Sequence, residues 1–474
     1  MKDSAIRRVA AILTGAILLS WPAIYNRYPL LYPDSITYLA SGRPVVRAIF
    51  LQKVSGYYGM RSLIYSLGIF PFHWNITPWP VVGLHSLLAA YTLWLVVRSI
   101  LERGILTHYL LLVGLLGLLS SLSWYASLIM PDVLGPLLYL VIYLLVFARE
   151  KLSGPERFSV ALIACWAAAS HITHLALAAG ICLLLAALWL LRCPQVQNRM
   201  KALGAVAVIL LMSAAAQVTL HAYLYGKPSL NADAPPFLAA RVIADGPGRW
   251  YLQGHCGQIH FALCENVDEL PESSEDFLWN PEGIWARAVS EDDDRIRTEE
   301  LHFAFAVLRA YPREEISIAA ANFWQQVAAF GLWDLDRNNW VLEAFDTALP
   351  GGKSSYLVSW QFNDDLPLDF FSAVQFWAVI ASLGIIGVAA VSPLLRRNAS
   401  ARLLGLSVVI LPTLVANALL TGVFSNVEER YQCRVVWLLP CVASLVSLHW
   451  LERHSGASRE GGGATWKSES QSGG

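Results

Sequence analysis

The sequence predicts a polytopic α-helical membrane protein with about ten transmembrane helices. Of its 474 residues, 56% are hydrophobic and only 15% are charged, whereas an average soluble domain has roughly 25% charged residues. The apolar residues gather in runs that reach the ~20 residues needed to cross the hydrocarbon core of a bilayer. These observations exclude a soluble multidomain protein, a disordered chain and a small disulfide scaffold.

The apolar runs divide the chain into two membrane modules. The expected spans are residues 9–25, 79–97, 105–124, 133–148, two helices within 158–191, 203–223, 371–391, 403–424 and 435–451. The run 158–191 is too long for one helix, so we divide it near His171–His174. The first seven spans form a core transmembrane module, residues 1–225, with a long first outer loop at 26–78. The last three spans lie in residues 371–452.

Lys and Arg in the short loops set the expected orientation, because these residues collect on the cytoplasmic side of a membrane. Basic residues precede the first span and follow the second, fourth, sixth, eighth and tenth. The first outer loop is also basic, but it is long, and the shorter loops agree with one another. We therefore expect both termini to be cytoplasmic, including a disordered Gly- and Ser-rich tail at 453–474.

The segment between the seventh and eighth spans, residues 226–370, is acidic and contains Pro and Gly turns. The orientation places this segment outside the cytoplasm, so we expect an extracytoplasmic domain of mixed secondary structure. Its residues 301–333 show a helical, aromatic pattern, which fits a helix on the membrane surface and an ordinary core helix equally well. No basic stripe lies on this domain, which argues against a nucleic-acid partner.

Two cysteines of the acidic segment, Cys256 and Cys264, lie eight residues apart. An oxidising compartment permits a disulfide between them. A zinc site that includes His255 and His260 is the alternative, but the spacing matches no standard ligand pattern. We therefore expect the disulfide.

Two acids stand out, because few carboxylates outside the acidic segment face outward. Asp34 follows the first span, and Asp132 opens the fourth. A membrane-embedded acid costs roughly 2.5–3.5 kcal/mol on insertion scales, so it is a functional candidate. Each acid also has an ordinary explanation, because a carboxylate in the first turn of a helix satisfies free amides and the helix dipole. The flanking Tyr32 and Tyr38 favour a lined groove at Asp34.

Histidines and basic residues on the same side of the membrane suit a phosphate. His171 and His174 lie one turn apart and share a helix face, where they could hold a phosphate or a metal ion. Core histidines are as common. Lys53 and Arg61 lie in the first outer loop, and Arg430 lies between the last two spans. Arg binds phosphate through paired hydrogen bonds, while headgroup anchoring is the alternative for each single cation.

The chain resembles the GT-C glycosyltransferases, polytopic enzymes that use polyprenyl-phosphate-linked sugars, such as the protein mannosyltransferases and the aminoarabinose transferases. The likeness covers most of residues 1–225 and 371–451. Many members carry Asp-Glu in the first outer loop where this chain has Asp34-Ser35. The motifs that carry the likeness are Pro33-Asp34-Ser35 with Tyr38, Pro131-Asp132, and Arg430-Tyr431 followed by Pro440.

The resemblance implies an inverting transfer of a sugar from a polyprenyl-phosphate donor to a hydroxyl of a glycan, lipid or protein acceptor. Asp34 would be the general base. Asp132 would orient the acceptor or help to hold a divalent metal ion, and the metal requirement stays open. The expected setting is the bacterial cytoplasmic membrane with its lipids, and the active site faces the extracytoplasmic side. The implied substrate-binding residues are Tyr38, Lys53, Arg61, His171, His174, Arg430 and Tyr431.

Two other classes of protein remain open. A transporter or flippase for a lipid-linked glycan would also be polytopic, with charges near the bilayer midplane, whereas the charges here cluster at the outer edge. A non-catalytic membrane sensor or assembly protein would use the acidic segment as its working part, but it would need fewer spans.

Reporter fusions test the predicted topology. Fusions at Ser290 and at Arg397 should report opposite sides of the membrane, because Ser290 lies in the acidic segment and Arg397 in a basic loop. The measurement is the activity of a reporter that works on only one side. The same signal from both positions would contradict the orientation.

Overall fold

The computed structural model describes residues 2–53, 61–230, 234–393 and 399–464. Within these ranges the chain is helical and contains no β-strand. Arg397, the second fusion position, and residues 465–474 of the expected tail lie outside the described residues.

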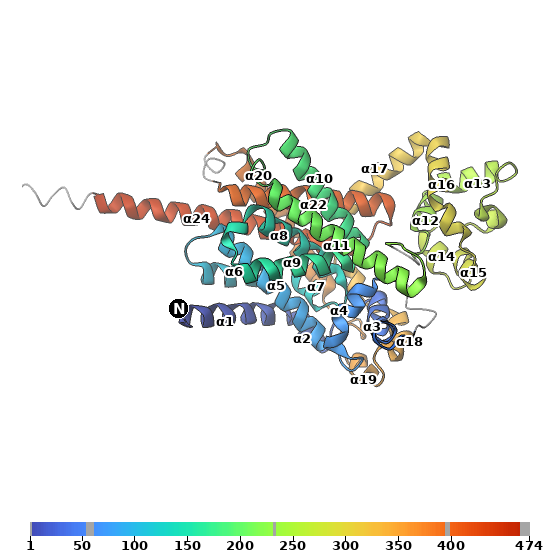
Figure 1. Cartoon of the computed structure of the whole chain (residues 1–474), viewed down its shortest axis with the longest axis horizontal. Helices are drawn as coiled ribbons and strands as arrows, with labels where there is room; N and C mark the ends of the chain where they lie inside the picture. The colour runs from blue at the N-terminus through green and yellow to red at the C-terminus, as the bar shows by residue number, and fades with distance from the viewer. Residues whose placement is uncertain (1, 54–60, 231–233, 394–398, 465–474) are drawn as a thin grey trace, which may run out of the picture.

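Most helices belong to a membrane body, and a smaller group forms a domain at one end (Figure 1). The body contains α1 (Lys2–Leu19), α2 (Trp21–Asn26), α3 (Pro33–Leu51), α4 (Leu63–His73), α5 (Trp79–Ile100), α6 (Ile105–Leu119), α7 (Leu122–Ser127), the 3-10 helix η1 (Pro131–Val133), α8 (Leu134–Phe147), η2 (Arg149–Lys151), α9 (Gly154–Ser170), α10 (Ile172–Leu190), α11 (Met200–Tyr225), η4 (Trp333–Leu335), α18 (Asn339–Ala348), α19 (Lys353–Leu357), α20 (Leu368–Val391), α22 (Ala401–Phe424), α23 (Glu429–Val436) and α24 (Leu438–Ala464). The domain contains α12 (Phe237–Ala244), α13 (Pro247–His255), η3 (Ala262–Glu269), α14 (Ser274–Trp279), α15 (Ile284–Ser290) and α16 (Arg295–Ala310), and α17 (Pro312–Ala328) leads back to the body.

The described residues form six helical stretches that are long and apolar enough to cross a membrane. These are α5, α10, α11, α20, α22 and the stretch Glu429–Arg453. The chain is thus a helical membrane protein, with fewer full-length spans than the ten predicted. The expected spans 105–124 and 133–148 are shorter helices, because Ser120 ends α6 and a 3-10 turn precedes α8. The predicted division of 158–191 is confirmed, since His171 separates α9 from α10.

The start of α1 and the end of α24 lie at the same end of the body, opposite α12–α16 (Figure 1). This arrangement fits an acidic domain and termini on opposite sides of a membrane. Helix α24 continues to Ala464, so it includes residues 453–464 of the tail for which disorder was expected. No Pro interrupts this stretch, and a helix can therefore continue through it.

Two hydrophobic cores divide the acidic segment. Residues from Ala239 to Val307 form a small separate core, and we call residues 237–311 the outer domain. Leu332, Phe345 and Leu368 instead pack in the large core of the body. The prediction of mixed secondary structure is wrong for the described part of this domain, which is helical, because turn residues such as Pro247 begin short helices there instead of joining strands.

The disulfide expected in the acidic segment is present in the structure. It joins Cys256, directly after α13, to Cys264 in η3, with their Cα atoms 5.4 Å apart. The bond therefore ties two short helices of the outer domain together.

The first outer loop is largely helical, and this fold fixes the position of Asp34. Helix α3 begins at Pro33, whose ring suits the first helical position, and the Tyr32 N–H donates to Ser35 Oγ at 2.9 Å. The Gln361 side chain accepts from the Leu31 N–H at 3.0 Å and donates to the Leu31 carbonyl at 2.8 Å. The start of α3 is thus held by a residue more than 300 positions away.

Candidate functional site

Asp34 lies between two arginines at the end of the body that faces the outer domain. Its Oδ1 is 2.7 Å from Arg61 Nη2, and its Oδ2 is 3.6 Å from Arg430 Nη1. Asp34 lies in the first turn of α3 and is 9% exposed, because both arginines cover it. A buried carboxylate is tolerated when nearby cations neutralise it, whereas an isolated buried carboxylate would destabilise the protein.

A backbone hydrogen bond and contacts with aromatic rings fix the position of Arg430. Its Nε and Nη1 atoms make no hydrogen bonds to the described residues. Its N–H donates to Asp334 Oδ2 at 2.7 Å, and its guanidinium lies 4.2 Å from the Tyr32 ring centroid and 5.3 Å from that of Tyr431. The Arg430 Nε and Nη1 atoms are both buried. Buried donors without acceptors define a place for an anion.

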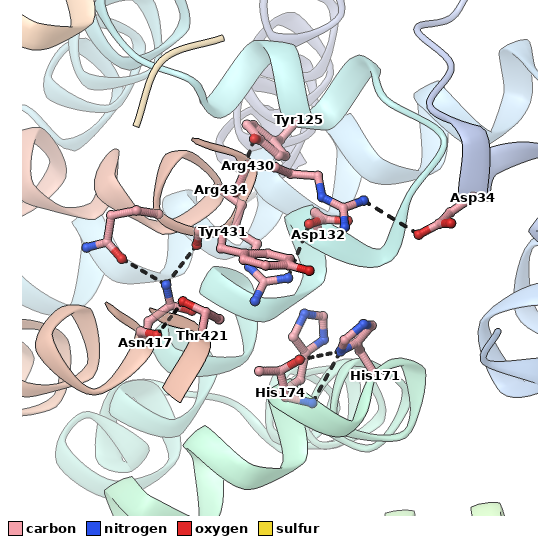
Figure 2. A network of polar contacts seen from close by, with 12 residues as sticks. Asp34, Tyr125, Asp132, His171, His174, Asn417, Thr421, Arg430, Tyr431 and Arg434 are labelled. Atoms are coloured by element: carbon pink, nitrogen blue, oxygen red, sulfur yellow. Dashed lines mark hydrogen bonds and ion pairs between the residues drawn. The ribbon is translucent and has the colours of Figure 1, made fainter. Parts of the chain in front are cut away.

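A second charge pair lies beside the first. Arg434 Nη1 donates to Asp132 Oδ1 at 3.2 Å, and both side chains are 3% exposed. Figure 2 shows Arg430 extending toward Asp34 and Arg434 linked to Asp132, with the Tyr431 ring against the Arg434 guanidinium. The two arginines lie four residues apart in α23, so they share one helix face. The contact of Asp132 with Arg434 goes beyond a helix-capping role.

His174 presents one free ring nitrogen, and His171 packs beside it. His174 Nδ1 is 3.0 Å from the Ala167 carbonyl, which fixes the ring, while its Nε2 has no partner among the described residues. The ring centroids of His171 and His174 are 5.3 Å apart. A Cβ on Gly135 would lie 2.8 Å from His174 Nε2, so this position needs glycine to leave room for the imidazole.

Tyr38 belongs to an aromatic wall behind Asp34. Its ring is 4.8 Å from that of Tyr65 in an edge-on contact, and the Tyr65 hydroxyl is 3.2 Å from His85 Nε2. Lys53, by contrast, is exposed just beyond the opposite end of α3. At 1.5 Å per residue, the end of α3 at Leu51 is about 26 Å from Asp34. Lys53 follows this end, so it lies outside the cluster, and its expected role in substrate binding is not supported by this position.

The outer domain reaches the site, which the sequence did not predict. The Arg61 guanidinium lies 5.4 Å from the Trp279 ring centroid, and Ser274 Oγ donates to Asn426 Oδ1 at 2.7 Å. Both outer-domain residues belong to α14. The spacing of Arg430 and Arg434 could have suggested Arg434 as a site residue. No local signal points to Trp279, because its contact joins segments more than 200 residues apart.

The described residues include no group of three His, Cys, Asp or Glu side chains arranged to hold a metal ion. No protein-family model matches the chain, and neither a curated protein nor a solved structure gives a match. Function is therefore inferred from the chemistry of the site.

Carboxylates surround the chain just before Arg430. Burial raises the pKa of Glu428 to about 7, with further contributions from Asp334 and Glu275. The three acids come from α14, η4 and the segment before α23. This acidic rim lies next to the buried cation, so the site has charge of both signs.

Replacing Asp132 with Asn should destabilise the protein by about 3–5 kcal/mol, because it leaves the buried Arg434 without a counter-charge. Denaturant unfolding of the purified protein measures the loss. A purely capping role would cost only about 1 kcal/mol. The double variant Asp132→Asn with Arg434→Met should regain much of the stability, and failure to do so would contradict the charge-pair account.

Glu428 should make stability depend on pH. An unfolded glutamate titrates near pH 4.3, so between about pH 4.3 and the folded pKa of about 7 the folded state binds more protons. Stability should therefore fall as pH rises through this window. Glu428→Gln should have a flatter pH profile of melting temperature, whereas the exposed control Glu343→Gln should follow the wild type. Identical profiles for all three proteins would refute the effect.

Proposed function

We propose that the chain is an integral membrane glycosyltransferase that transfers a sugar from a polyprenyl-phosphate donor to an acceptor on the extracytoplasmic face. The observation that carries the proposal is the position of Asp34 between Arg61 and Arg430, with the buried Arg430 Nε left without a hydrogen-bond partner among the described residues. A carboxylate beside a guanidinium with free N–H groups suits a reaction in which a hydroxyl loses a proton and a phosphate leaves.

Arg430 would bind the donor phosphate. Its buried guanidinium is in a low-dielectric environment, where its attraction for an anion exceeds that in water. The rings of Tyr32 and Tyr431 flank the guanidinium and limit its orientation. The free Nε2 of His174 would be a second polar contact for the donor. Because charge grows on the phosphate as the sugar leaves, these contacts would strengthen in the transition state.

Asp34 would act as the general base. The acceptor oxygen bonds to the anomeric carbon while the bond from that carbon to the phosphate oxygen breaks. The hydroxyl proton passes to Asp34, and the polyprenyl phosphate departs with its negative charge beside Arg430. Arg61 would hold the carboxylate in place, since it makes the shorter of the two ion pairs. Asp132 would act through Arg434 and not on the acceptor directly.

The position of the site supports the proposed sidedness. Asp34 and Arg61 lie next to the outer domain through Trp279, and the termini lie at the far end of the body (Figure 1). A lipid-linked donor would reach Arg430 from the membrane, and a polar acceptor would arrive from the side of the outer domain. We propose the bacterial cytoplasmic membrane as the setting, with a glycan, lipid or protein as the acceptor.

A sugar-transfer assay with polyprenyl-phosphate sugars tests the proposal. Asp34→Asn should lower turnover by about 10²–10⁴-fold, the usual contribution of a general base. Arg430→Ala should weaken both donor binding and turnover. Lys53→Ala is the matched control, because Lys53 is a cation of the same loop that lies away from the cluster, and its activity should be unchanged.

Stability must be measured beside activity, because Asn at position 34 leaves two arginines without their shared counter-charge. We expect a lower melting temperature for Asp34→Asn than for Lys53→Ala. Near-normal transfer by a folded Asp34→Asn protein would dismiss Asp34 as the base. Absence of transfer by the wild type with every donor tested, together with movement of a lipid-linked glycan across vesicles, would favour a flippase.

A further inference from the structure

Helix α17 buries two amide side chains and exposes two large apolar ones, and the polar Ser317 and Gln325 are also exposed. Asn322 and Gln326 face the protein and are 8% and 0% exposed, while Ile316 and Trp324 face outward and are 65% and 68% exposed. A helix in water buries its apolar face and exposes its polar face. The opposite arrangement is expected where the surroundings are lipid and polar side chains pair inside the protein.

The charges of this segment fit the same explanation. Charged residues of α17 are confined to its first turn, at Arg313, Glu314 and Glu315, and none occurs from Ile316 to Leu332. This uncharged stretch continues past the end of α17 at Ala328. The helix therefore begins in a polar environment and proceeds into one that charged residues avoid.

The outward face of α17 continues the apolar surface of two candidate spans. A Cβ on Gly422 of α22 would lie 2.8 Å from the Asn322 carbonyl oxygen, so α17 packs directly on the end of that span. Phe330, two residues after α17, stacks on Phe376 of α20 with ring centroids 6.1 Å apart. Phe376 lies about 12 Å along α20 from its first residue. The neighbouring Trp377 is 67% exposed on the same span.

From these contacts we propose that α17 is embedded in the leaflet of the bilayer next to the outer domain, with Ile316 and Trp324 against lipid. Its first turn lies at the headgroups, and its C-terminal half lies among the upper acyl chains. The occupant of the exposed face is lipid and not a protein, because α17 packs on α22 and the following Phe330 stacks on α20, and both helices are long and apolar enough to cross a membrane. The inference is independent of the proposed glycosyltransferase activity.

The embedded helix also supports the candidate site. Gln326 Nε2 donates to the Glu428 carbonyl at 2.8 Å, and its Oε1 accepts from the Glu428 N–H at 3.0 Å. Glu428 lies two residues before Arg430. One face of α17 thus contacts lipid, and the other face is bonded to the segment just before Arg430. The depth of α17 in the membrane therefore determines the depth of this segment.

Spin-label accessibility in nanodiscs tests the inference. The full chain is labelled at single introduced cysteines after the half-buried Cys165, Cys182 and Cys193 are replaced by Ala, and it is reconstituted in phosphatidylcholine and phosphatidylglycerol. Collision rates with oxygen, which enters lipid, and with a polar nickel complex are then compared. The labelled variants are Trp324→Cys, Ile316→Cys, Trp377→Cys as the lipid reference and Phe305→Cys, equally exposed on α16, as the water reference.

We expect position 324 to match position 377, with high oxygen and low nickel accessibility, and position 305 to show the reverse. Position 316 should fall between the two, because it lies about 12 Å nearer the start of the helix. High nickel accessibility at 324 would overturn the proposal. Low accessibility to both reagents at 324 would also overturn it, because a protein or a second copy of the chain would then cover the face.

A stability measurement provides an independent test. Trp324→Glu should lower the melting temperature in nanodiscs, because it places a charge in lipid. Phe305→Glu, a matched change on the outer domain, should have little effect. Equal melting temperatures for the two variants would contradict the embedded position of α17.

Discussion

The charge balance around Asp34 is the interaction on which the rest of the site depends. A carboxylate in a mostly buried position is tolerated only when cations accompany it, and here Arg61 and Arg430 do so from two distant parts of the chain. The fold must therefore bring the first outer loop and the segment after α22 together. Arg434 neutralises Asp132 in the same way a short distance away. Helix α23 therefore provides a cation for each of the two acids, Asp34 and Asp132.

The contacts around this pair show why the outer domain cannot be regarded as a separate module. Trp279 stacks on Arg61, and Asp334 binds the backbone of Arg430. The two arginines that hold Asp34 are thus both supported by residues from the acidic segment. A ligand that moved this segment would change the position of both cations. Such coupling follows from direct contacts and needs no long pathway through the body.

Several polar groups inside the membrane body are paired with the backbone. Gln361 binds Leu31 and Leu335, and Gln375 donates to the Phe330 carbonyl. These bonds fix loops at the ends of helices, where backbone groups would remain unsatisfied in lipid. Other buried side-chain atoms of the body have no hydrogen-bond partner among the described residues, and those of Arg430 and His174 lie at the candidate site. An unsatisfied buried donor is costly, and an anion bound at Arg430 Nε would remove that cost.

The sequence by itself determined the membrane class and the division at His171, and it singled out Asp34, Asp132 and Arg430 as candidates, because hydropathy and the rarity of charge in apolar surroundings are local properties. Only the tertiary structure decided which charges meet. It paired Asp132 with Arg434, brought Trp279 to Arg61, left Lys53 outside and assigned residues 332–368 to the body. These outcomes depend on contacts between segments as many as 300 residues apart, and no local pattern of residues encodes which of several cations will neutralise a given acid.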